Sequence, residues 1–237
     1  MAARTRVKAR TRLVGVIATT ADLRQALAMR HKPDLFELRL DCLVGKERLL
    51  ERQRAKLGRP LIITARHPAE GGAYRLSTAR RRDLLRRFLP LARYVDIELG
   101  SADALHSLLQ VGGSQKVKRI LSFHDFASTP SRGSLHAKAR RATDLGADVF
   151  KVATRVETNA QLARLLEFTM EARSFIPLSV MGMGPLGAIS RVMLAECGSI
   201  FTYVALANKK VEGQLTVDQF KIAMRLFAPA RKSRGRR

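Results

Sequence analysis

Short apolar runs rich in β-branched residues alternate with stretches of helical composition along almost the whole chain. The runs are nearly continuous in hydrophobicity, which is typical of strands buried on both faces of a parallel sheet. The predicted strands cover residues 13–18, 35–40, 60–65, 94–99, 119–123, 148–153, 176–181 and 200–205. The predicted helices cover 21–30, 47–57, 78–89, 102–110, 135–145, 157–171, 186–197 and 217–227. Few folds accommodate so many strand–helix units in succession.

This alternation predicts a single-domain (β/α)8 TIM barrel, because both the number of units and the length of 237 residues suit that fold. A doubly wound open sheet is the alternative, but the chain lacks the glycine-rich first turn that would favour it. We expect the barrel to occupy residues 13–228. A basic arm at 1–12 and a basic tail at 229–237 are expected to be disordered.

The formal net charge of +24 raises the hypothesis of a polyanion partner. Part of this charge lies in the arm and the tail, and a further group lies in the predicted helix 78–89, where we expect the arginines to form a solvated outer face. No nucleic-acid-binding motif or aromatic stacking platform accompanies the charge. The composition therefore predicts non-specific attraction to polyanions through the basic ends at low salt, without a dedicated groove.

Cysteine usage and hydropathy indicate a cytoplasmic protein without a membrane span. Cys42 and Cys197 have neither metal-ligand spacing nor a disulfide framework around them, so we interpret both as reduced packing residues. No apolar run approaches the ~20 residues that a membrane span needs. The first residues also lack the apolar segment of a signal peptide.

Lys151 stands at the centre of the apolar run 148–154. A lysine inside a buried strand is costly, because apolar neighbours do not replace the hydration of its ammonium group. Two interpretations stay open from the strand alone. The chain can bend so that Lys151 reaches solvent, as most lysines do. Alternatively, burial and neighbouring cations favour the neutral amine, which attacks carbonyl groups.

Other polar residues recur where predicted strands end, the part of such a barrel that carries the chemistry. Each has a possible structural role as well: Arg39 could pair with Asp41 and Arg66 with Glu70, and His124 could be a core histidine. Their recurrence on consecutive strands favours a functional site. The candidates are Glu37, Arg39, Asp41, Arg66, Asp96, Glu98, His124, Lys151, Arg191 and Gln214.

Six short motifs in order resemble the signatures of the type I 3-dehydroquinate dehydratase family. They are ELRLD at 37–41, TARHPAEGG at 64–72, SFHDF at 122–126 with Thr129 and Pro130, FKVA at 150–153, MGPLGAISR at 183–191 and GQL at 213–215. Each is short, but together they span nearly the whole chain between the basic ends. The resemblance agrees with the barrel predicted from periodicity.

The resemblance implies a metal-free, cofactor-free lyase of the shikimate pathway that dehydrates 3-dehydroquinate to 3-dehydroshikimate. Lys151 would form a Schiff base with the substrate ketone, His124 would act as general base and acid, and Glu70 would orient His124. Substrate binding would involve Glu37, Arg39, Arg66, Arg191 and Gln214, with Arg191 pairing with the carboxylate. The family also implies a homodimer.

One position departs from the family pattern. The family usually has serine four residues before the glutamine, and here that position is Lys210. The change affects the expected lid geometry and affinity more than the reaction. Two other hypotheses remain: another Schiff-base barrel enzyme such as a class I aldolase, and a basic polyanion-binding scaffold without activity.

Overall fold

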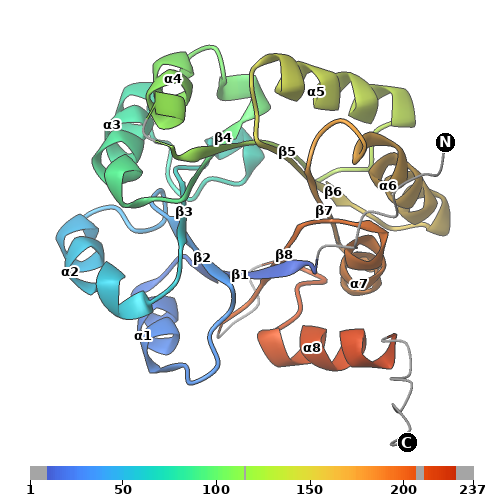
Figure 1. The fold of residues 1–237 in the computed structure, drawn as a ribbon, viewed down its shortest axis with the longest axis horizontal. Helices are drawn as coiled ribbons and strands as arrows, with labels where there is room; N and C mark the ends of the chain where they lie inside the picture. The colour runs from blue at the N-terminus through green and yellow to red at the C-terminus, as the bar shows by residue number, and fades with distance from the viewer. Residues whose placement is uncertain (1–9, 115, 207–210, 228–237) are drawn as a thin grey trace, which may run out of the picture.

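A computed structural model describes residues 10–114, 116–206 and 211–227. Eight parallel strands stand around a central axis, and helices surround them (Figure 1). This confirms the predicted (β/α)8 barrel and excludes the open doubly wound sheet. The strands are β1 (Arg12–Ile17), β2 (Leu35–Arg39), β3 (Leu61–Thr64), β4 (Tyr94–Glu98), β5 (Lys118–Asp125), β6 (Val149–Arg155), β7 (Leu178–Met183) and β8 (Phe201–Val204).

The strands are hydrogen-bonded in the order β7-β6-β5-β4-β3-β2-β1-β8. Between β7 and β8 the barrel is nearly closed by individual hydrogen bonds instead of a regular ladder. The Ile200 amide donates to the Leu178 carbonyl at 2.8 Å, and the Val180 amide donates to Ser199 Oγ at 2.9 Å. Ser199 therefore satisfies backbone groups at the position where strand pairing is incomplete.

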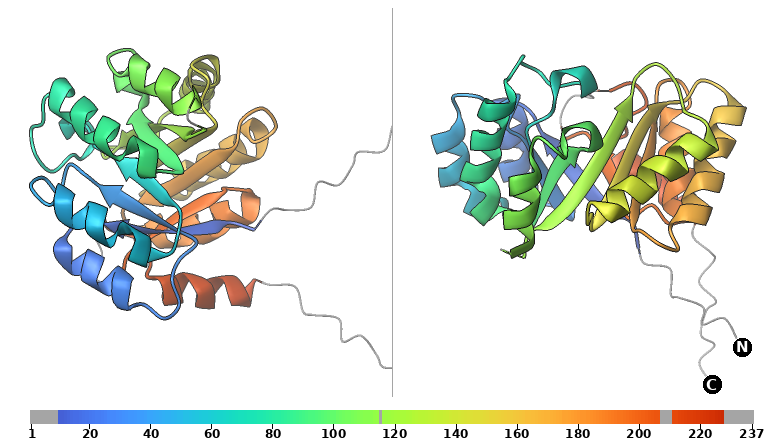
Figure 2. Two further views of the ribbon diagram at one scale, coloured as in Figure 1. Left: turned by 60° about the vertical axis from the view of Figure 1, so that its left-hand side comes forward. Right: turned by 90° about the horizontal axis from the view of Figure 1, so that it is seen from above.

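The helices form a ring outside the strands, as the end-on and side views show (Figures 1 and 2). Three of them begin with a reciprocal capping box, in which Thr19, Thr158 and Thr216 are the N-cap residues. The helices are α1 (Thr20–Ala28), α2 (Glu47–Leu57), α3 (Thr78–Phe88), α4 (His106–Ser114), α5 (Arg132–Asp144), α6 (Asn159–Ala172), α7 (Gly187–Cys197) and α8 (Val217–Leu226). Within the described ranges, no helix is long and apolar enough to cross a membrane.

Two boundaries differ from the sequence prediction in ways that matter for the site. Strand β5 continues to Asp125, so His124 lies on the strand and not beyond it. The fourth helix begins at His106, four residues later than predicted, because a 3-10 turn at Leu99–Ser101 follows β4 first. The added length of β5 gives His124 the rigid backbone of a paired strand.

Apolar side chains fill the barrel interior below the carboxyl ends of the strands. At its amino-terminal end the rings of Tyr94 and Phe201 meet edge to face, with centroids 5.3 Å apart. The guanidinium carbon of Arg12 lies 4.6 Å from the Phe201 centroid, and Arg12 Nη2 donates to the Tyr94 hydroxyl at 3.1 Å. We call these three residues the floor of the barrel.

The predicted boundary of the basic arm, at residue 12, is wrong. Arg12 was assigned to a disordered arm but is the first residue of β1, and Thr11 before it is buried and donates to the Ser199 carbonyl at 2.6 Å. A single arginine just before an apolar run looks like part of a charged tail in the sequence. The predictions for residues 1–9, for the tail and for Lys210 lie outside the described residues.

Candidate active site

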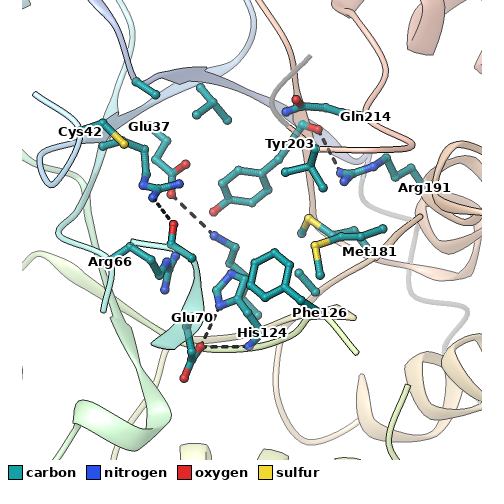
Figure 3. A pocket seen from close by; sticks show the side chains of 18 residues that line it. Glu37, Cys42, Arg66, Glu70, His124, Phe126, Met181, Arg191, Tyr203 and Gln214 are labelled. Carbon is teal, nitrogen blue, oxygen red and sulfur yellow. Dashed lines mark hydrogen bonds and ion pairs between the residues drawn. The ribbon is translucent and has the colours of Figure 1, made fainter. Parts of the chain in front are cut away.

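A cavity of about 310 Å³ opens at the carboxyl ends of the strands (Figure 3). Every binding or catalytic residue predicted from the sequence lines it. The residues with a predicted binding or catalytic role are Glu37, Arg39, Arg66, Glu70, His124, Lys151, Arg191 and Gln214. The cavity wall also includes Cys42, Phe126, Met181, Met183 and Tyr203. The structure thus brings together side chains from six of the eight strands or the segments that follow them.

Lys151 lies on β6 with 4% of its surface exposed, so it does not reach bulk solvent as the structural interpretation required. Its Nζ lies 2.8 Å from Asp96 Oδ2 and 3.6 Å from Glu37 Oε1. From the sequence we expected cations next to the Lys151 amine. In the structure the charged atoms that contact it belong to carboxylates. These carboxylates hold the buried nitrogen at the cavity wall and can accept its protons.

A buried charge network continues outward from Asp96. Arg66 donates from Nη2 to Asp96 at 2.9 Å and from Nη1 to Glu98 at 3.1 Å, and Ser122 Oγ donates to Asp96 at 2.6 Å. Burial alone would raise the pKa of Asp96, but the positive charges of Arg66 and Lys151 outweigh it and lower this pKa far below its ordinary value. Asp96 therefore stays ionised. Arg66 pairs with Asp96 and Glu98 on β4, and not with Glu70 as the structural alternative suggested.

Arg81 extends this network into helix α3. It is 1% exposed, its Nη2 pairs with Glu98, and its Nε donates to the Ala65 carbonyl at 2.7 Å. The prediction that the α3 arginines form a solvated face is wrong for this residue, because Glu98 gives it a buried partner. Arg81 holds Glu98, which in turn holds Arg66 against Asp96.

His124 and Glu70 form a hydrogen-bonded pair in the cavity wall. His124 Nδ1 lies 2.9 Å from Glu70 Oε2, and the same carboxylate oxygen accepts the His124 backbone amide at 3.0 Å. Burial, together with the charges of Arg66 and Lys151, lowers the pKa of His124 well below its ordinary value. Burial also raises the pKa of Glu70 to about 7. The imidazole is therefore neutral, as a general base requires, and Glu70 controls which ring nitrogen carries its proton.

Arg39 is held at the cavity edge by a fork-shaped pair with Asp41. Its Nε and Nη2 donate to the two Asp41 oxygens at 3.0 and 2.8 Å, and Nη2 also donates to the Gly71 carbonyl at 2.9 Å. Asp41 is fully buried and further accepts the backbone amides of Arg66 and Ala73. The Arg39–Asp41 pair is thus structural, and it also directs Arg39 into the cavity wall.

Arg191 lies on α7 and is 3% exposed. Its Nη1 donates to the Tyr203 carbonyl at 3.1 Å and its Nε to the Gly213 carbonyl at 3.2 Å. Among the described residues no carboxylate pairs with it, and burial lowers the pKa of Arg191 to about 10. A buried guanidinium bound only by neutral carbonyls is suited to receive an anionic ligand group.

Gln214 reaches the same cavity because the loop after β8 packs closely on the start of α7. Gly213 has a φ of +77°, and a Cβ there would lie 2.6 Å from Gly187 Cα. Any larger residue at position 213 would push this loop away. Gly213 therefore positions both Gln214 and the carbonyl that binds Arg191.

Cys42 also lines the cavity, with its Sγ 3.5 Å from Asp41 Oδ2. Burial raises the pKa of its thiol to about 11, so the thiol is protonated at neutral pH and is a poor nucleophile. Within the described ranges, no group of three His, Cys, Asp or Glu side chains is placed to hold a metal ion. The amine of Lys151 also lines this cavity.

Sequence reasoning missed part of the site. Tyr203, Arg81 and Ser122 were not among the candidates, because a tyrosine on an apolar strand, an arginine on a helix and a small hydroxyl on a strand are common elsewhere. The parity of β8 was the available signal for Tyr203: it lies two residues beyond Phe201 of the floor and so faces the same interior.

Fold and site define a class of protein: a (β/α)8-barrel enzyme with an amine, a neutral imidazole and a buried guanidinium, which no described carboxylate pairs with, at the carboxyl ends of its strands. Comparison with known proteins gives the family. Residues 14–229 match the family model described as type I 3-dehydroquinase. The chain belongs to the type I 3-dehydroquinase family.

Individual relatives agree along the full length of the barrel. The chain is 31% identical over 218 residues to 3-dehydroquinate dehydratase of Methanocella arvoryzae, covering 91% of this chain and 96% of that protein. The crystal structure of 3-dehydroquinate dehydratase from Geobacillus kaustophilus superposes with a TM-score of 0.84 at 29% identity, covering 92% and 91% of the two chains. The type I enzyme of Clostridium difficile, solved with covalently modified comenic acid, has a TM-score of 0.83 at 25% identity, with 92% of each chain covered.

Proposed function

We propose that this protein dehydrates 3-dehydroquinate to 3-dehydroshikimate, in the shikimate pathway, through a Schiff base on Lys151. The observation that carries this proposal is a buried amine beside a carboxylate, facing a cavity that also contains a neutral histidine and an arginine without a carboxylate partner among the described residues. Family membership supplies the substrate. The covalently modified ligand in the Clostridium difficile relative supports a covalent step.

Binding precedes chemistry. Arg191 receives the substrate carboxylate, because its guanidinium is buried without an anionic partner among the described residues. Glu37 and Arg39 contact substrate hydroxyls from the opposite wall, and Gln214 contacts the substrate from the last loop. Arg66 contributes mainly through its charge, since Asp96, Glu98 and Ser122 already engage its Nη atoms.

Lys151 then attacks the ketone carbon and forms an iminium ion with loss of water. The iminium acidifies the adjacent carbon, and His124 removes a proton from that carbon to give an enamine. His124 Nε2 makes no hydrogen bond to the described residues and is available as the base, while Nδ1 is held by Glu70. The enamine expels the β-hydroxyl group, which the imidazolium protonates, and hydrolysis of the new iminium releases the product and Lys151.

The direct test of the proposed function is turnover. The purified protein should convert 3-dehydroquinate to the conjugated product, followed by its ultraviolet absorbance, and Lys151→Ala should lack this activity. A class I aldolase would instead cleave a hydroxylated ketone by retro-aldol reaction. A scaffold would do neither. Failure of the parent protein to form the conjugated product would contradict the proposal.

A homodimer is the proposed assembly. Neighbouring helices α7 and α8 expose apolar side chains at i, i+4 spacing: Ile189 and Met193 on α7, and Ile222 and Leu226 on α8. Such side chains suit an interface with a second copy. Light scattering after size-exclusion chromatography should give twice the 26.4 kDa monomer mass, and Ile222→Glu with Met193→Glu should give the monomer. A monomeric parent protein would contradict this assembly.

A cytoplasmic location is also proposed, since Cys42 is a free thiol. Cell fractionation of the native protein tests it, and recovery outside the cytoplasmic fraction would contradict it.

Non-specific polyanion contact is proposed for the basic ends, at residues 1–9 and 228–237. Deleting both segments should lower the salt needed to elute the protein from heparin, while leaving kcat/KM unchanged.

A further inference from the structure

The hydroxyl of Tyr203 is a buried polar group without a partner among the described residues. Tyr203 lies on β8, is 4% exposed and lines the cavity described above. Its oxygen makes no hydrogen bond to any described residue. Buried hydroxyls in folded proteins nearly always have a partner, and an unpaired one costs free energy. Such a group inside an active-site cavity indicates that a ligand supplies the partner.

The position of the ring restricts which ligand atom this can be. Lys151 Nζ lies 4.0 Å from the centroid of the Tyr203 ring. The ring therefore covers one side of the nitrogen that bonds to the substrate carbon, while Asp96 and Glu37 approach the nitrogen as anions. Tyr203 and Lys151 line the same cavity, so a ligand atom bonded next to Nζ would lie on the side of the cavity that carries this ring.

We propose that the Tyr203 hydroxyl donates a hydrogen bond to the ketone oxygen of the substrate while Lys151 Nζ adds to the ketone carbon. The inference rests on the proposed function and adds a catalytic residue to it. As the C–N bond forms, the π electrons of the carbonyl move onto oxygen. A neutral donor beside that oxygen stabilises the charge that develops there.

The proton balance of the step is complete without a proton from tyrosine. The ammonium form of Lys151 and the ketone give the iminium and one molecule of water, so two lysine protons leave with the ketone oxygen and the positive charge stays on nitrogen. The carboxyl group of Glu37, 3.6 Å from Nζ, is placed to carry these protons, while Asp96 stays ionised beside the nitrogen. Burial, with the charges of Glu37 and Asp96, raises the pKa of Tyr203 well above its ordinary value, so the phenol stays a donor throughout.

The aromatic ring has a separate contribution. Its face lies against Nζ, and a cation over an aromatic face is stabilised by the ring quadrupole. Phenylalanine would retain this contact and lose only the hydroxyl. Tyr203→Phe therefore isolates the proposed hydrogen bond from the packing and cation contacts of the ring.

The experiment measures how fast the Schiff base forms. Parent and Tyr203→Phe proteins are mixed with 3-dehydroquinate, quenched with sodium borohydride at increasing times, and the fraction of modified protein is read from intact mass. Tyr94→Phe is the matched control, because Tyr94 lies on the barrel floor and its hydroxyl accepts a hydrogen bond from Arg12 at 3.1 Å. Thermal unfolding of all three proteins is recorded in parallel.

We expect Tyr203→Phe to form the adduct about 10-fold more slowly than the parent, and Tyr94→Phe to form it at the parental rate. Tm should not fall in Tyr203→Phe, because the hydroxyl it removes has no partner among the described residues. An adduct rate in Tyr203→Phe equal to that of the parent would overturn this inference and leave the proposed function intact. Absence of any adduct in the parent protein would overturn both.

Discussion

The two ends of the barrel interior each place a cation against a tyrosine on a strand, but they satisfy the surrounding polar groups differently. On the floor, Arg12 lies over Phe201 and donates to the Tyr94 hydroxyl. At the cavity, Lys151 lies against the face of Tyr203, whose hydroxyl has no partner among the described residues. Tyr203 and Phe201 are two residues apart on one strand.

Within one barrel interior, the floor residues therefore serve stability and the cavity residues serve function. The floor pairs its polar groups and closes the barrel, as a structural element does. Among the described residues, the cavity retains a neutral imidazole, a guanidinium without a carboxylate partner and a hydroxyl without a hydrogen bond, each at a free-energy cost that a bound substrate can offset. Changes at the cavity should therefore affect catalysis, and changes on the floor should affect unfolding.

Among variants that keep Lys151, the largest effect is expected for His124→Ala. Loss of the general acid and base should lower kcat by about 10²- to 10⁴-fold. The matched control is His136→Ala on α5, which breaks another histidine–glutamate pair, with Glu171 at 2.7 Å, outside the barrel. Steady-state kinetics should show parental kcat for the control. Equal losses in the two variants would remove the distinction between the cavity and the rest of the fold.

Arg191→Lys should raise KM about 10- to 100-fold, because one ammonium replaces a planar fork that binds a carboxylate through two parallel hydrogen bonds. Arg173→Lys is the control, since Arg173 is exposed and donates to the Cys197 carbonyl at 3.0 Å. The comparison is made by steady-state kinetics on 3-dehydroquinate. Parental KM in Arg191→Lys would show that the substrate carboxylate binds elsewhere.

The pH dependence should reflect Glu70, whose pKa is raised to about 7 by burial. Ionised Glu70 accepts the proton of His124 Nδ1 and leaves Nε2 free as a base, whereas protonated Glu70 donates to Nδ1 and places the ring proton on Nε2. Below pH ~7, kcat/KM should therefore fall about 10-fold per pH unit. Glu70→Gln should lose this limb of the profile. A limb that persists unchanged in the variant would belong to another group.

The smallest effect is expected on the floor. Arg12→Ala should lower the free energy of unfolding by about 1–2 kcal/mol and Tm by ~2–8 °C, since it removes a cation over an aromatic face and a hydrogen bond. The kcat and KM values should stay parental. Calorimetry and kinetics on the same sample check both statements. A large loss of kcat with unchanged Tm would mean that the two ends are coupled.

Periodicity was sufficient to predict the barrel, because eight apolar strands separated by amphipathic helices leave few alternatives. Strand parity also placed the cavity, since side chains such as Glu37 and Lys151 point inward at the carboxyl ends of parallel strands. Both inferences depend on the local repeat of strand geometry, which the sequence expresses directly.

What escaped prediction depended on partners distant in sequence. Arg81 was expected to be solvated, and only its contact with Glu98 explains its burial. Arg12 looked like part of a charged tail until the rings of Tyr94 and Phe201 were seen beneath it. The sequence around Tyr203 is that of an ordinary strand. Its role becomes apparent only from Lys151, which it faces across the barrel. Pairing between elements is not encoded in local periodicity.

In the proposed mechanism Lys151 becomes covalently bonded to the substrate, and this bond can be trapped directly. The protein is incubated with 3-dehydroquinate and sodium borohydride, digested, and its peptides are mapped by mass spectrometry. We expect loss of activity and one reduced ligand on the peptide that contains Lys151, with no adduct in Lys151→Ala and a retained adduct in His124→Ala. A folded protein that dehydrates the substrate without forming this adduct would contradict the account.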